Sequence, residues 1–132
     1  MTGKPTQDPI SHDASGAIVA AISREIVGIY AEYYGRGPTK AKTMWREDIV
    51  TCILEDAFTR AERVLVDGGR FEQVRLNRQA FQDEIEPLFR RTIEKVTGRR
   101  VETCLSQINR DGVAAEIFVL GPVQGEPTEL RS

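Results

Sequence analysis

Histidine and cysteine are scarce in this 132-residue chain, which contains one histidine and two cysteines. His12 lies near the N-terminus, and Cys52 and Cys104 are far apart in apolar segments. Zinc sites and Ser-His or Cys-His catalytic pairs need several such side chains close together. We therefore expect no metal, no cofactor and no nucleophilic catalytic site. Isolated cysteines in apolar segments behave as small hydrophobic residues, so we expect both thiols to be reduced and buried.

Long hydrophobic runs are also missing. No apolar stretch approaches the roughly 20 residues that a membrane-spanning helix needs, and residues 1–13 lack the apolar centre of a signal peptide. We expect a cytoplasmic protein that does not insert into a membrane. With 18 Lys and Arg against 20 Asp and Glu, the net charge is −2. An overall negative field disfavours nucleic acid as a partner, although a local basic patch would still allow it.

The length and composition indicate one folded domain with polar ends. Residues 1–12 contain two prolines and few apolar side chains, which predicts a flexible N-terminal arm. Residues 121–132 are rich in Gly, Pro and charge, which predicts a disordered tail. The domain itself is expected over residues 13–120.

Three segments have apolar residues at the three- and four-residue spacing of amphipathic helices. The first helix is expected to begin after an Asp13 cap, and its core stripe consists of Ile18, Ile22, Ile26, Ile29 and Tyr33. Thr59 and Glu62 form a capping box that begins the second helix, and Pro87 is expected to kink or divide the third. The expected ranges are 14–34, 59–68 and 71–97.

Four segments rich in apolar and β-branched residues predict strands over 40–45, 48–54, 100–108 and 113–120. Arg46-Glu47 and Asp111-Gly112 are expected at the turns of two hairpins. The order α-β-β-α-α-β-β predicts an α+β two-layer sandwich with a four-stranded, mostly antiparallel sheet and three helices. A sheet edge left open, together with Leu76 and Phe89 outside the main helical stripe, predicts a homodimer.

A glycine-containing basic loop between the first helix and the first strand is the main candidate site. It consists of Gly35, Arg36, Gly37, Pro38, Thr39, Lys40 and Lys42. Gly35 can end the helix and Pro38 restricts the turn. The helix precedes the loop and a strand follows it, which is the reverse of a phosphate-binding P-loop. Two interpretations remain: a cationic surface for an anion or an acidic partner, and a structural corner.

Carboxylates supply the other chemistry that we considered. Pairs occur at Glu47-Asp48, at Glu55-Asp56 and at Glu84 with Glu86. All lie at expected turns or on a helix with interleaved cations such as Arg78 and Arg90. Such mixed charge is typical of an exposed face with ion pairs, so we assign no catalytic residue.

Several motifs together resemble the MpsC-like family, a small prokaryotic domain named for a sodium-translocating, membrane-potential-generating system. They are G-R-G-P-T-K at 35–40, D-I-V-x-x-x-L-E at 48–55, the segment from Phe58 to Glu62, the helix from Arg78 to Leu88 and T-G-R-R-V at 97–101. The likeness covers about residues 14–120. It implies an accessory role beside a membrane ion or bicarbonate uptake system and supplies no catalytic residues.

The leading hypothesis is a non-enzymatic accessory or regulatory module that presents the basic loop to an anion or an acidic partner, such as a protein of a membrane transport system. An alternative is an RNA-binding domain with the element order of one KH arrangement, although the KH glycine loop lies between helices. An enzyme that uses carboxylates is the remaining alternative.

Overall fold

The computed structural model describes residues 16–123. The expected N-terminal arm, the Asp13 cap, His12 and most of the expected tail lie outside this range. Within it, the elements follow the predicted order. They are α1 (Gly16–Tyr34), β1 (Lys40–Arg46), β2 (Ile49–Glu55), α2 (Arg60–Asp67), α3 (Phe71–Thr97), β3 (Val101–Ile108) and β4 (Ala114–Leu120).

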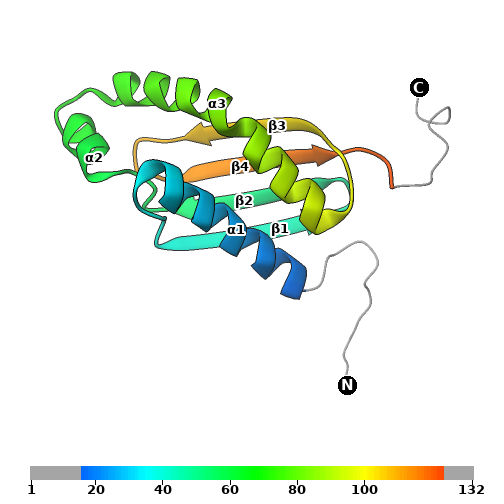
Figure 1. The fold of residues 1–132 in the computed structure, drawn as a ribbon. Coiled ribbons are helices and arrows are strands. Elements are labelled where there is room, and N and C mark those ends of the chain that lie inside the picture. The colour runs from blue at the N-terminus through cyan, green and yellow to red at the C-terminus, as the bar shows by residue number, and fades with distance from the viewer. Residues whose placement is uncertain (1–15, 124–132) are drawn as a thin grey trace.

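The four strands form one sheet in the order β1-β2-β4-β3, and every neighbouring pair is antiparallel. Helices α1 and α3 lie across the same face of this sheet, and α2 lies toward one end of it (Figure 1). This arrangement confirms the predicted α+β sandwich. The turn of the first hairpin falls at Glu47-Asp48, one residue later than expected, and Glu47 adopts a positive φ of 53°.

The core lies between the helices and the inward side chains of the central strands. Alternate residues of β2 and β4 are buried against α1 and α3. The strands contribute Val50, Cys52, Leu54 and Phe118, and the helices contribute Ile22, Ile26, Tyr30, Phe89 and Ile93. Two expectations were wrong here. Tyr33 is exposed because α1 packs at its end through Tyr30 and Tyr34, and Phe89 is buried between the layers rather than left uncovered.

Local chemistry explains where the helices begin and end. Thr59 Oγ1 accepts a hydrogen bond from the Glu62 N–H at 3.1 Å, while the Glu62 carboxylate accepts one from the Thr59 N–H at 2.8 Å, which confirms the capping box. Gly98 ends α3 with a φ of 73°. Pro87 does not divide α3, which continues through it for 27 residues, but the helix bends along its length in Figure 1.

Both cysteines are free, as predicted. Cys52 is buried, whereas Cys104 is only half-buried because its strand, β3, forms an edge of the sheet. Strand β4 lies between β2 and β3, so the two thiols are separated by a strand.

Candidate functional site

The basic loop is a closely packed connection. Gly35 has a φ of 88°, and its N–H donates to the Ala31 carbonyl at 3.1 Å, which ends α1. A Cβ at Gly37 would lie 3.0 Å from the side chain of Val27, so the loop packs directly against the helix. Pro38 is buried. These contacts explain the glycines and the proline by backbone geometry and close approach.

Arg36 connects this loop to the segment between β2 and α2. Its guanidinium donates to the backbone carbonyls of Asp56 and Phe58 at 2.8 and 2.6 Å, and to the Asp56 carboxylate at 2.8 Å. Asp56 has a positive φ of 57°, so the arginine bonds a turn whose backbone conformation is uncommon for a residue other than glycine. Arg36 therefore has a structural role.

The lysines of the same motif lie elsewhere. Lys40 and Lys42 are exposed side chains on β1, two residues apart and therefore on one face of the strand. Among the described residues neither lysine forms an ion pair, although Lys40 lies across from Glu55 in the register. Thr39 is exposed, and its N–H donates to the Glu55 carbonyl at 3.1 Å. The motif is thus split between a structural half and a cationic half.

A buried polar cluster, which sequence reasoning missed, lies between α1, α3 and the sheet. Its centre is the Glu116 carboxylate of β4, which is 2% exposed. The same carboxylate oxygen accepts hydrogen bonds from Tyr30 Oη at 2.7 Å, Ser106 Oγ at 2.9 Å and Gln82 Nε2 at 3.2 Å. Burial raises the pKa of Glu116 to about 7, even though these donors and the charge of Arg78 favour the ionised form.

Arg78 is the second charged member of this region and is 4% exposed. It donates to both carboxylate oxygens of Glu62, at 2.8 and 2.7 Å, and to the Ala57 carbonyl at 2.5 Å. Its guanidinium also lies 4.0 Å from the centre of the Tyr34 ring. The expectation of an exposed Arg78 was wrong, because two hydrogen-bonded carboxylate oxygens and an aromatic face compensate its burial.

Glu62 thereby joins the capping box of α2 to the core. Burial opposes ionisation of this carboxyl, but hydrogen bonds from Arg78 and Thr59 outweigh burial and lower its pKa. Within the described residues, two buried polar atoms have no hydrogen-bond partner, namely Tyr34 Oη and Arg78 Nη1. Burial raises the pKa of Tyr34 to about 12, so its hydroxyl keeps its proton at neutral pH.

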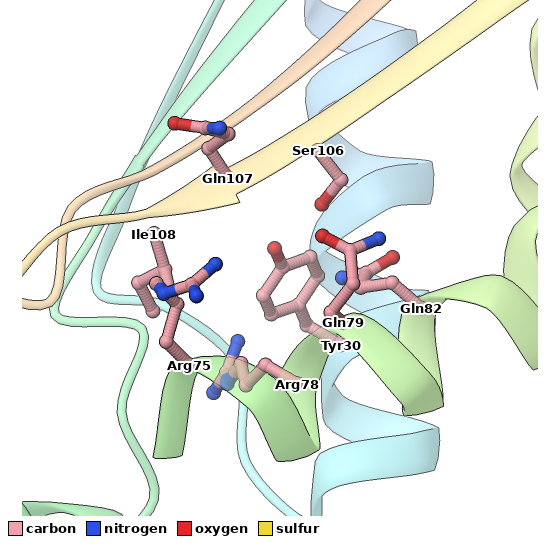
Figure 2. Close-up of a pocket in the computed structure, with 8 residues that line it drawn as sticks. All are labelled: Tyr30, Arg75, Arg78, Gln79, Gln82, Ser106, Gln107 and Ile108. Carbon is pink, nitrogen blue, oxygen red and sulfur yellow. The ribbon is translucent and has the colours of Figure 1, made fainter. Parts of the chain in front are cut away.

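A small hollow opens beside the cluster. Figure 2 shows side chains of α3, including Arg78, Gln79 and Gln82, across from β3, with the Tyr30 ring between them. Ser106 points toward the hollow and Gln107 points away from it, as the alternation of a strand requires. The hollow measures about 40 Å³, which is room for about one water molecule. Typical ligand pockets measure about 300–1,000 Å³.

Sequence signals for these buried polar residues exist. Glu116 occupies an inward position of a strand whose other inward residues, Ala114, Phe118 and Leu120, are apolar. Arg78 and Gln82 occupy stripe positions of α3 between Val74 and Ile85. A polar residue at an inward position of an otherwise apolar pattern is therefore the signal that was available.

The carboxylates considered from the sequence lie at the surface. Three of them form ion pairs, Asp48 with Arg99, Asp56 with Arg36 and Glu86 with Arg90. Residues 16–123 contain no group of three or more His, Cys, Asp and Glu side chains that could hold a metal ion. None of the described helices is long and apolar enough to cross a bilayer.

In a comparison with known protein families, residues 14–121 match the family model described as "Na+-translocating membrane potential-generating system (MpsC)". No curated protein and no solved structure matches the chain. The family match covers more than half of the sequence and agrees with the resemblance carried by the motifs at 35–40 and 97–101. The chain therefore belongs to the MpsC family.

Proposed function

We propose that the chain is a non-enzymatic, cytosolic accessory or regulatory module of the membrane-potential-generating system for which its family is named. In this proposal it binds an acidic segment of a partner protein through the edge strand β1. The observation that carries the proposal is the pair of exposed lysines, Lys40 and Lys42, on a strand whose outer edge pairs with no other described strand.

An open strand edge presents N–H and C=O groups to which an extended peptide can add as a further strand. Carboxylates two residues apart on such a peptide would share the spacing of Lys40 and Lys42. Arg36 supports this surface indirectly, because its bonds to the β2–α2 segment hold the loop from which β1 begins. Gly35, Gly37 and Pro38 contribute through the same loop geometry.

Because Arg36 has structural partners, replacing it would confuse binding with stability. The test therefore uses the double variant Lys40→Gln and Lys42→Gln. Its matched control is Arg91→Gln and Lys95→Gln, which removes two exposed cations from α3 and changes the net charge equally. The probe is a fluorescent peptide of alternating glutamate and valine, and a glutamine-valine peptide controls for charge.

We expect the β1 double variant to weaken peptide binding roughly tenfold at low salt, because each lysine contributes one charge contact at the rim of the interface. The α3 variant should bind as the wild type does, and thermal unfolding of both should be unchanged. An equal loss of peptide affinity in the two double variants would show that binding depends only on the net charge of the protein. No binding to the wild type would refute the edge-strand site, and RNA co-purifying with the chain would support the RNA-binding alternative.

A further inference from the structure

The face of the sheet opposite the helices is apolar at its centre. Within residues 16–123, α1 and α3 lie on the other face and α2 lies toward one end of the sheet, so no described helix covers this face (Figure 1). One row of outward side chains crosses all four strands in register, in the order Met44, Thr51, Ile117 and Leu105. Met44 and Leu105 are 46% and 54% exposed. Three of these four side chains are apolar, and an apolar patch on an open sheet face marks an interaction site.

The neighbouring row on each side is also apolar on the two central strands, but its two ends on the edge strands are polar. They read Arg46, Ile49, Val119, Thr103 on one side and Lys42, Ile53, Ala115, Gln107 on the other. The two central strands are thus apolar in both rows, the β1 ends are basic and the β3 ends are polar and uncharged. Depletion of charge at the centre with a polar rim is typical of protein interfaces.

We propose that this face binds a second copy of the chain, by stacking of the two sheets about a two-fold axis parallel to the strands. Such an axis places β1 over β3 of the partner and β2 over β4 of the partner. Met44 then faces Leu105 of the other copy, and Ile53 faces the small Ala115. The basic ends of β1 lie over the uncharged ends of β3.

The charge pattern favours this axis over a two-fold axis perpendicular to the strands, which also stacks the same faces. A two-fold axis in the plane of the sheets but perpendicular to the strands would place β1 over β1 and Arg46 over Lys42. Like charges that face each other across an interface are unfavourable. The parallel axis avoids this contact and pairs apolar with apolar side chains at the centre, except where Thr51 faces Ile117.

The area of the face indicates how tightly the two copies should bind. Four strands spaced about 4.8 Å apart, each about seven residues long at roughly 3.3 Å per residue, span about 19 by 23 Å. Two such faces bury roughly 900 Å², which is less than the roughly 1,200 Å² of stable specific complexes and is in the range of weak ones. We therefore expect a dimer with a micromolar dissociation constant. The inference does not depend on binding of an acidic partner at Lys40.

Sedimentation of the full chain over micromolar to millimolar concentrations tests the proposal with a matched pair of variants. Leu105→Lys places a charge on the sheet face, and Leu76→Lys makes the same change on α3. Leu76 is similarly exposed, at 57%, and lines a separate hollow of about 500 Å³ between α2 and α3. We expect the first to weaken dimerisation roughly tenfold or more and the second to leave it unchanged.

A charge swap tests the axis. Met44→Lys and Leu105→Glu should each weaken the dimer alone and restore it together, because each new charge faces its opposite on the other copy. Within one chain these positions lie about 14 Å apart across the sheet, so a rescue reports contact between copies. A monomeric wild type, loss of the dimer with Leu76→Lys alone, or absence of rescue would overturn the proposal.

Discussion

Glu116 is a buried acid whose ionisation works against folding. Its pKa is about 7 in the folded protein, against an ordinary value of 4.5. The folded state holds the Glu116 proton more tightly than the unfolded state does. The contribution of Glu116 to the free energy of unfolding is therefore fully present below pH 4.5 and is lost as the pH rises to about 7. An acid with a lowered pKa, such as Glu62, has the opposite effect: its contribution to stability is lost as the pH falls below 4.5.

We expect Glu116→Gln to flatten this dependence. Each pKa unit corresponds to about 1.4 kcal/mol, so the wild type should lose about 3 kcal/mol relative to the variant between pH 4.5 and 7. Urea unfolding at a series of pH values measures the difference, with the exposed Glu84→Gln as control. Parallel stability curves for wild type and Glu116→Gln would show that the carboxyl is not the cause.

At the scale of elements, we expect alanine to have opposite effects at a glycine within a helix and at a glycine that ends one. Gly28 lies within α1 with open space around its Cα and no positive φ, so alanine there should stabilise the protein by up to about 1 kcal/mol. Gly98 ends α3 with a φ of 73° and also has open space. Gly98→Ala should therefore destabilise by about 1 kcal/mol through the backbone alone. Thermal unfolding of the two variants separates the effects, and a shift of the same sign in both would contradict this account.

At the scale of the whole molecule, the two thiols distinguish local from global opening. Burial raises the pKa of both Cys52 and Cys104 to about 11, so both are mostly protonated at neutral pH. Cys104 lies on an edge strand and is half-buried, whereas Cys52 lies on a central strand. Opening an edge strand disturbs fewer contacts than opening the core.

We expect a thiol reagent to label Cys104 through local opening and Cys52 only through global unfolding. The single-thiol variants Cys52→Ala and Cys104→Ser report each site, and the labelling rate is followed against urea concentration. The Cys52 rate should increase with the full urea dependence of unfolding, and the Cys104 rate should be faster and less dependent on urea. Equal rates with equal urea dependence would mean that the sheet opens as one unit.

The helices and strands, their order and the antiparallel hairpins follow from the amino-acid sequence alone. Helical and strand spacing, the Thr59 capping box, and Gly98 and Gly112 at their ends and turns are local signals, because each acts within a few residues. The glycines and proline of the basic loop also indicated a sharp corner. These local features persist in the folded chain.

The partners of the polar side chains and the open face of the sheet depend instead on how the elements pack in three dimensions. Tyr30 and Glu116 are 86 residues apart in the sequence and meet because β4 lies between β2 and β3. The sequence left two interpretations open for the loop of Arg36, and the fold shows that Arg36 bonds the segment after β2. An apolar alternation shows which residues share a face, but strand order and helix placement decide what that face contacts. Those contacts join distant parts of the chain, so no local pattern encodes them.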